Sequence, residues 1–187
     1  MSTESDRTHA VVEVPKGVTF ALHGRRLVAK GPLGSVERPF PSEVLDLKVA
    51  GGEATLTLRL PAGRKTSQAL LGTWAAHVRN LGRGLTLGVE AKMKVVAAHF
   101  PMKVAVKGDE LVIENFLGEK YPRTSHLVRG TKAQVEGEFV ILGGTDIEQV
   151  GQSAANIERT THIRDYDPRV FQDGIYLTER AHFKEAS

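Results

Sequence analysis

The side chains in this sequence best suited to bind a ligand are arginines and lysines that lie in two stretches without any acid. The chain has 187 residues and a formal net charge of +3, but residues 1–94 hold 14 Lys and Arg against 8 Asp and Glu, whereas residues 95–187 hold 11 against 14. The acid-free stretches are residues 15–36 and 54–89. Cations that neighbouring acids do not neutralise favour a polyanion such as nucleic acid. An ordinary solvated surface explains the two stretches about equally well.

No residue pattern predicts catalysis or metal binding. The seven histidines lack the His-x-x-x-His or His-x-His spacing of a metal site, and the chain has no cysteine to serve as a thiolate ligand or nucleophile. The sequence contains neither a Gly-x-Ser-x-Gly nucleophile elbow nor a glycine-rich nucleotide-binding loop. We therefore expect no cofactor, no metal and no enzymatic activity. An enzyme with a site near His99, between the two halves of the chain, is the weakest alternative.

The elements that must position the basic side chains occur twice in the sequence. Residues 18–28 align with residues 102–112 at an offset of 84. In both segments alternating apolar residues meet a turn at a glycine and then a second short apolar run, a pattern typical of a β-hairpin. The repeat continues where Gly52 aligns with Gly137 at an offset of 85. The sequence therefore contains a tandem duplication.

This duplication predicts an α+β fold. We expect two tandem similar domains, the first at residues 9–88 and the second at residues 89–187, with a C-terminal basic and aromatic extension on the second. Each domain is expected to be a small antiparallel β-sheet packed against one main helix.

The first helix is predicted to begin near Arg64 and to bury one apolar face. At 100° per residue the apolar side chains fall within roughly one 100° sector; they are Leu70, Leu71, Trp74, Val78, Leu81 and Leu85. The opposite side alternates cations with small residues, namely Lys65, Gly72, Ala76, Arg79 and Arg83. A glycine on an exposed helix face costs roughly 1 kcal/mol relative to alanine and indicates close approach of another molecule. That molecule is an RNA backbone or a protein segment.

The second helix is predicted to begin with a capping box in which Thr145 is the N-cap and Glu148 the reciprocal partner. Its inner stripe is Ile147, Val150, Ala154 and Ile157. Its outer side is polar but uncharged, which suits hydrogen bonds to sugar hydroxyls or to a partner's backbone. An ordinary polar face is equally compatible. The outer residues are Gln149, Gln152, Ser153, Asn156 and Thr160.

The tail of the second copy interleaves cations with aromatic rings, and nothing comparable follows the first copy. Such a mixture holds phosphates and stacks on unpaired bases. Asp173-Gly174 predicts a turn, after which residues 175–177 return to the sheet as a strand. The tail's residues of these two kinds are Arg159, Arg164, Arg169, Arg180, Lys184, Tyr166, Phe171, Tyr176 and Phe183.

One short motif suggests a different RNA-binding module. Gly31-Pro-Leu-Gly34 matches the Gly-x-x-Gly loop of KH domains. In a KH domain that loop joins two helices, whereas here it joins two expected strands. A tight turn between strands is therefore the better interpretation.

Two segments of the second copy carry a family resemblance. They are Glu114-Asn115-Phe116-Leu117-Gly118-Glu119-Lys120, with Arg123 close behind, and Arg169-Val170-Phe171-Gln172-Asp173-Gly174-Ile175-Tyr176. With the Val-Pro-Lys-Gly-Val start at Val14 and the Lys-Gly-Pro-Leu-Gly turn, nearly the whole chain resembles the sixth family of large-subunit ribosomal proteins, in its archaeal and eukaryotic branch.

The resemblance implies a cytoplasmic, non-catalytic constituent of the large ribosomal subunit. It implies binding to large-subunit rRNA near the region where translational GTPases act, with neighbouring ribosomal proteins as further partners. The second domain would supply the principal RNA contacts, at Lys120, Arg123, Arg164, Arg169 and Tyr176. Because the positive excess lies in the first copy, Arg64, Lys65, Arg79 and Arg83 are kept as secondary candidates.

The main alternative is a non-catalytic protein–protein adaptor built on the same duplicated domain. Its docking sites would be the uncharged side of the second helix and the surface around Gly72 and Ala76. No apolar stretch has the length of a membrane span, and the polar, acidic start of the chain does not resemble a targeting signal. We expect a cytoplasmic protein without a membrane segment.

Overall fold

The computed structural model describes residues 8–59, 65–164, 166–167 and 169–185. By its internal contacts the chain divides into two compact units, Met1–Leu87 and Gly88–Ser187. Each unit is described by itself. None of the described helices is long and apolar enough to cross a membrane.

Unit 1 consists of two three-stranded antiparallel sheets and one long helix, α1, at Lys65–Leu87. One sheet has the strand order β1-β6-β5 and the other β2-β3-β4. The strands are β1 (His9–Glu13), β2 (Thr19–His23), β3 (Arg26–Gly31), β4 (Gly34–Pro39), β5 (Leu45–Ala50) and β6 (Glu53–Leu58).

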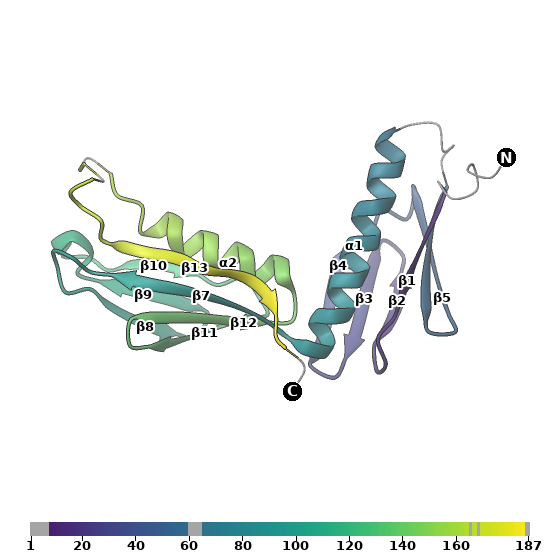
Figure 1. Ribbon diagram of the computed structural model, residues 1–187, viewed down its shortest axis with the longest axis horizontal. Coiled ribbons are helices and arrows are strands. Elements are labelled where there is room, and N and C mark those ends of the chain that lie inside the picture. Colours follow the sequence, from purple (N-terminus) through teal and green to yellow (C-terminus); the bar gives the residue numbers. More distant parts are fainter. Residues whose placement is uncertain (1–7, 60–64, 165, 168, 186–187) are drawn as a thin grey trace. The chain divides into compact units, whose positions relative to one another are not determined.

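Unit 2 repeats this arrangement and adds one strand at the end (Figure 1). Its sheets have the orders β11-β12-β7-β13 and β10-β9-β8, and all pairings are antiparallel. Its elements are β7 (Val89–Val96), β8 (Lys103–Lys107), β9 (Glu110–Glu114), the short 3-10 helix η2 (Phe116–Gly118), β10 (Arg123–His126), β11 (Thr131–Glu136), β12 (Phe139–Gly144), α2 (Ile147–Thr160) and β13 (Gly174–Phe183). The predicted α+β fold with tandem similar domains is confirmed.

Burial of alternate strand residues and one helix stripe forms the core of each unit. In unit 1, α1 packs against β1, β3 and β6, and Trp74 meets Phe40 edge-on with ring centroids 4.9 Å apart. All six apolar residues predicted for this helix lie in or against the core. Gly31 is required where β3 passes the helix, because a Cβ there would lie 2.7 Å from the Cβ of Leu85.

In unit 2, α2 lies across the sheet formed by β12, β7 and β13 (Figure 1). The predicted N-cap, Thr145, is wrong by one residue. Asp146 caps the helix: its backbone is extended (φ −119°, ψ 117°), and its carboxylate accepts a 3.0 Å hydrogen bond from the N–H of Glu148. An Asp one position later takes the same role that the sequence pattern gave to threonine.

Strand pairing fixes the register of the duplication. The β5–β6 turn joins Ala50 to Glu53, and the β11–β12 turn joins Glu136 to Phe139. The offset here is therefore 86, so the predicted offset of 85 is wrong by one residue. Two glycines at positive φ, Gly51 (62°) and Gly137 (59°), occupy the same turn position.

The two helices share a pattern of burial. Leu71, Ala75 and Val78 are buried in α1, and Val150, Ala154 and Ile157 are buried at the same spacing in α2. A Cβ added at Gly72 of α1 or at Gly151 of α2 would meet nothing within 4 Å.

The copies differ at two places in unit 2. In unit 1, Gly31 pairs with Gly34 across a two-residue turn between β3 and β4, so the Gly-x-x-Gly motif is a strand-to-strand turn as expected. In unit 2 the corresponding connection is longer, residues 115–122, and contains η2. The second difference is β13, the predicted returning strand, which pairs with β7.

Candidate nucleic-acid interface

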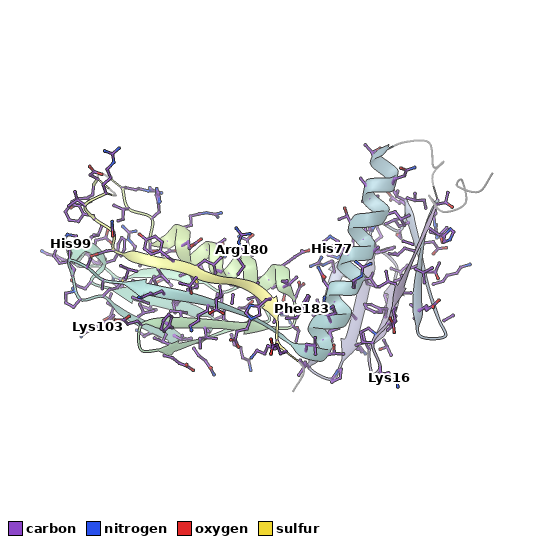
Figure 2. All side chains as sticks on the ribbon, viewed as in Figure 1. Lys16, His77, His99, Lys103, Arg180 and Phe183 are labelled. Atoms are coloured by element: carbon purple, nitrogen blue, oxygen red, sulfur yellow. The ribbon has the colours of Figure 1, made fainter. Side chains whose placement is uncertain are left out.

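Three connections meet at one end of unit 2, which we call the loop end. They are the described residues of 97–102 between β7 and β8, 115–122 between β9 and β10, and 161–173 between α2 and β13. Figure 2 labels His99 and Lys103 at this end of the unit.

Asp173 joins the third connection to the first. Its side chain is 3% exposed, and its carboxylate accepts hydrogen bonds from the backbone N–H of Ala98 (2.7 Å), His99 (3.1 Å) and Phe100 (3.4 Å). Burial alone would raise the pKa of this carboxyl. The backbone donors and the His99 ring outweigh burial and hold the pKa below its ordinary value. Asp173 is therefore an anionic anchor for a loop that contains Phe100, 73 residues earlier in sequence.

Arg123 joins the second connection to the end of α2. Its Nη2 and Nε donate to the two carboxylate oxygens of Glu119 at 2.6 and 2.8 Å, and its Nη1 donates to the carbonyl oxygens of Thr160 at 2.7 Å and His162 at 3.3 Å. The guanidinium also lies 4.2 Å from the ring centroid of Phe116. The hydrogen bonds that Arg123 donates to Glu119 lower the pKa of the Glu119 carboxyl. The geometry makes Arg123 a residue that positions the loop.

Aromatic rings line the loop end. The rings of His99 and Phe171 lie 4.8 Å apart, and those of Phe171 and Tyr166 also lie 4.8 Å apart. Phe100 packs beside Gly118, whose φ of 76° and close contact with that ring both favour glycine.

Several of the rings at this end face solvent. Tyr121 is the most exposed of the large hydrophobic side chains that the structure describes, at 85%. Tyr166, Tyr176 and Phe100 are also exposed. An exposed flat ring is able to stack on an unpaired base.

Tyr176 follows the turn at the start of β13. Its hydroxyl donates to the carbonyl oxygen of Gln172 at 3.1 Å, and its ring lies against Gly174, where a Cβ would come within 2.9 Å of it. Burial, and then the nearby charges of Asp173 and Glu158, raise the pKa of this phenol. The hydroxyl closes the turn while part of the ring remains accessible.

The predicted cations of unit 2 divide into two groups. Lys120, Arg164 and Arg169 are exposed at the loop end, and Lys103 adds a fourth exposed cation beside it. A surface depression of about 410 Å³ runs past Arg159, His162 and Arg164 at the end of α2. Arg123, by contrast, is only half-exposed and engaged within the chain.

The helix face predicted in unit 1 is present on α1. Gly72, Arg79 and Arg83 are exposed, and Ala76 is half-buried. The open space around Gly72 means that no described residue of the chain explains a glycine at this position. Lys65 begins α1, although the structure does not describe its side chain, and Arg64 lies outside the described residues.

Other basic residues of unit 1 are paired in space with acids that lie outside their sequence stretch. Arg25 contacts Glu43 at 2.8 Å and Arg26 contacts Glu37 at 2.9 Å. The first acid-free stretch is therefore partly neutralised by the fold.

The polar side of α2 differs from its prediction at one residue. Ser153 is fully buried, where its hydroxyl donates to the carbonyl oxygen of Gln149 and accepts from the N–H of Val128. The exposed amide of Gln152 donates to Asn156 at 2.9 Å, and Asn156 donates to the carbonyl oxygen of His126 at 3.4 Å. Several polar side chains on this side of α2 therefore form hydrogen bonds within the chain, which weakens the hypothesis that this side docks a partner protein.

Comparison with known sequences identifies the family. The sequence model described as Ribosomal protein L6 matches this chain twice, at residues 14–88 and at residues 100–174. The chain belongs to the ribosomal protein L6 family. The two matches correspond to the two copies of the duplicated domain, so the resemblance seen in the sequence is confirmed.

Relatives within the ribosomal protein L6 family are similar along nearly their whole length. The large ribosomal subunit protein uL6 of Methanosarcina mazei is 45% identical over 170 residues, which is 91% of this chain and 96% of that protein. The uL6 of Ignicoccus hospitalis is 44% identical over 176 residues, 92% of this chain and 94% of that protein. The uL6 of Methanobrevibacter smithii is 43% identical over 169 residues, 90% and 94% respectively.

Sequence reasoning on this ribosomal protein L6 chain missed Tyr121 and Phe100 at the loop end. Tyr121 adjoins Lys120, so a basic residue next to an aromatic residue was a usable signal. Phe100 had no such signal, because its place at the loop end depends on contacts with residues distant in sequence, Asp173 and Gly118. The sequence predicts Asp173 only as a turn residue, because its role as an anchor depends on backbone groups far away in sequence.

Proposed function

We propose that this protein is a cytoplasmic structural constituent of the large ribosomal subunit and binds large-subunit rRNA through the loop end of unit 2. The observation that carries the proposal is the convergence of three connections that expose aromatic rings and cations together. The names of the uL6 relatives supply the large subunit as the setting.

The chemistry of the loop end suits a folded RNA. Lys120, Arg164 and Arg169 would contact phosphates, and Tyr121 and Tyr166 would stack on bases that leave a helix. Asp173 and Arg123 hold the connections in place before binding, which reduces the ordering entropy that binding would otherwise cost. Tyr176 would contribute its exposed ring.

A second, more diffuse contact involves the exposed face of α1. Arg79 and Arg83 would meet a phosphate backbone there, and Gly72 would allow it to approach the helix closely. Lys65, at the start of α1, and Arg64, which lies outside the described residues, remain candidates for the same contact.

The family resemblance further supports a position near the site where translational GTPases act, beside neighbouring ribosomal proteins. In this function the chain performs no catalysis. It holds rRNA in a fixed conformation, and its specificity comes from the shape of the loop end rather than from a reacting group.

Binding to the purified large-subunit rRNA across a salt series tests the proposal. Each phosphate contact contributes a slope of about −0.7 to −0.9 to log K against log salt. We expect Arg164→Glu with Arg169→Glu to make that slope shallower and to remove the tagged chain from large subunits in a sucrose gradient. Arg129→Glu with Lys132→Glu is the matched control, because these two exposed cations flank the start of β11, at the other end of the strands, and give the same charge change.

Two results would contradict the proposal. One is an affinity for rRNA that does not change with salt. The other is sedimentation of the wild-type chain apart from large subunits under all conditions.

A further inference from the structure

The outer edge of β1 is unpaired within the described residues, although the same edge in unit 2 is covered. In unit 1 the sheet order is β1-β6-β5, so β1 is an edge strand. In unit 2 the order is β11-β12-β7-β13, and β7 is flanked on both sides. Duplication makes β1 the counterpart of β7. Among the described residues, the strands β5, β6 and β1 of unit 1 correspond to β11, β12 and β7 of unit 2, and no strand of unit 1 corresponds to β13.

The pairing registers align the two strands residue by residue. Val12 pairs with Ala54 in unit 1, and Met93 pairs with Val140 in unit 2. These four residues are all buried and occupy matching places. It follows that His9, Val11 and Glu13 of β1 correspond to Glu90, Lys92 and Lys94 of β7.

Along this edge, the backbone of β1 presents hydrogen-bonding groups that pair with no strand among the described residues. The N–H of Val14 donates to the carbonyl oxygen of Gly52, and the N–H of Leu58 donates to the carbonyl oxygen of Thr8, both at 2.8 Å. Even-numbered residues of β1 therefore bond to β6. Because donors and acceptors alternate along an antiparallel strand, His9, Val11 and Glu13 direct their N–H and C=O groups outward.

Unit 2 shows what covers this edge. Across the β7–β13 pairing Glu179 stands opposite Lys92, and the Nζ of Lys184 lies 2.8 Å from a carboxylate oxygen of Glu90. The hydroxyl of Thr178 donates to the carbonyl oxygen of Lys92 at 2.9 Å. The covering strand is therefore matched to β7 in charge as well as in backbone pairing.

The open edge of β1 lacks the usual protection against such pairing. Edge strands avoid association through lysine, proline or a bulge. The sequence His-Ala-Val-Val-Glu contains neither of these residues, and its pairing with β6 is regular. Val11 is 52% exposed at the centre of the edge.

We propose that an extended segment of a neighbouring protein of the large subunit pairs with β1 as a fourth strand, in the place that β13 occupies in unit 2. By the charge matching seen there, this segment carries an apolar residue opposite Val11 and a lysine or arginine opposite Glu13. RNA fits the edge poorly, since Glu13 repels phosphate and the outward carbonyls need donors. The setting in the large subunit rests on the function proposed above.

Hydrogen exchange at single-residue resolution tests this proposal on the whole chain in three states: free, bound to rRNA alone and within purified large subunits. In the free chain the outward amides of His9, Val11 and Glu13 exchange faster than the inward amides of Ala10 and Val12. In large subunits we expect the three outward amides to become at least roughly tenfold more protected. With rRNA alone they remain unprotected.

A pair of proline variants isolates the edge. Val11→Pro removes one outward donor without breaking a bond to β6, because proline is tolerated at the free edge of a strand. Val49→Pro is the matched control, because Val49 is also an exposed valine and lies on the opposite edge strand, β5. The N–H of Arg59 donates to the carbonyl oxygen of Val44, so the even-numbered residues of β5 bond to β6. The odd-numbered Val49 therefore directs its N–H outward, as Val11 does. In subunits, Val11→Pro should reduce protection at His9 and Glu13 by about tenfold, the equivalent of one net hydrogen bond, and Val49→Pro should not.

Each other outcome overturns the proposal. Unprotected outward amides in subunits that contain the chain would refute the added strand and leave the proposed function intact. Protection by rRNA alone would show that RNA covers the edge. Protection that appears in the free chain as its concentration rises would show that a second copy covers it. If the chain never enters large subunits, the proposed function fails and this proposal fails with it. Should Val11→Pro not fold, the wild-type exchange pattern still decides.

Discussion

The carboxylate of Asp173 accepts a 2.7 Å hydrogen bond from the backbone N–H of Ala98, which lies 75 residues earlier in the chain. The same side chain bonds the N–H groups of His99 and Phe100. A single buried anion therefore fixes the entry to β8 against the entry to β13. The arrangement resembles a helix N-cap in its chemistry, because a carboxylate satisfies several backbone donors that no strand or helix partner reaches.

Asp173→Asn should destabilise unit 2 by about 1–3 kcal/mol, because the amide removes the charge and one acceptor from a site of buried donors. The difference should depend on pH. The folded pKa of Asp173 lies below its unfolded value, so its contribution is complete above the ordinary Asp pKa of about 3.9 and disappears as the pH falls through the folded pKa. Urea unfolding at neutral pH and at decreasing acid pH measures both effects.

Asp167→Asn provides the control for that experiment. Asp167 lies in the same connection and accepts from the N–H of Arg169 at 2.9 Å, but it is exposed. Its loss should change the free energy of unfolding by no more than about 0.5 kcal/mol. Equal effects at Asp167 and Asp173 would show that Asp173 is not the anchor.

Arg123→Lys should lower stability without changing the salt dependence of RNA binding. Lysine cannot reproduce the two-pronged pairing with Glu119 together with the bonds to the carbonyls of Thr160 and His162. A double-mutant cycle with Glu119→Gln should give a coupling energy of about 1 kcal/mol, because both side chains are partly exposed. The pKa of Glu119 is lowered by Arg123, so the coupling should be complete above the ordinary Glu pKa and weaken as the pH falls through the folded value.

Arg164→Lys is the comparison. At this exposed site lysine would keep the proposed phosphate contact, so stability and salt dependence should both stay close to those of the wild type. The opposite pattern at Arg123, with unchanged stability and a shallower salt slope, would show that its guanidinium reaches RNA directly.

The strands and the duplication were predictable from sequence because their signals are local. Alternating apolar residues and glycine turns depend on neighbours two or three positions away, as at Gly51 and Gly137. The one-residue errors have the same origin. Whether Thr145 or Asp146 caps α2 depends on which side chain reaches the free N–H groups of the helix. Whether the repeat shifts by 85 or 86 depends on which residues pair across the turn. The residue types alone determine neither.

The candidate site was less predictable because its assembly depends on distant contacts. The family resemblance implies the same role for Arg123 and Arg164. Only the structure separates them, since the two carbonyl oxygens that accept from Arg123 lie 37 and 39 residues away. Charge counting failed in a similar way for Arg25, whose partner Glu43 lies outside the acid-free stretch.

Tyr121→Ala should weaken binding to rRNA by about 1–3 kcal/mol, the range for loss of one base stacked on an aromatic ring. Because Tyr121 is 85% exposed, the free energy of unfolding should change by less than about 0.5 kcal/mol. Tyr121→Phe keeps the ring and should bind nearly as well as the wild type. Filter binding at fixed salt and urea unfolding measure the two quantities. If alanine binds as tightly as phenylalanine, Tyr121 does not stack on RNA.

Gly72→Ala should stabilise the free chain and weaken its incorporation into large subunits. A Cβ at Gly72 meets nothing within 4 Å, so alanine gains about 0.5–1 kcal/mol of helix propensity without a clash. Gly82→Ala on the same helix is the control, because its Cβ would lie 2.9 Å from Cδ of Pro15 and should destabilise unit 1. Thermal unfolding separates these two effects, and sucrose-gradient competition against the wild type measures incorporation. A more stable variant that competes poorly would show that a partner backbone lies against α1 at Gly72, whereas equal competition would show that this glycine has no role in assembly.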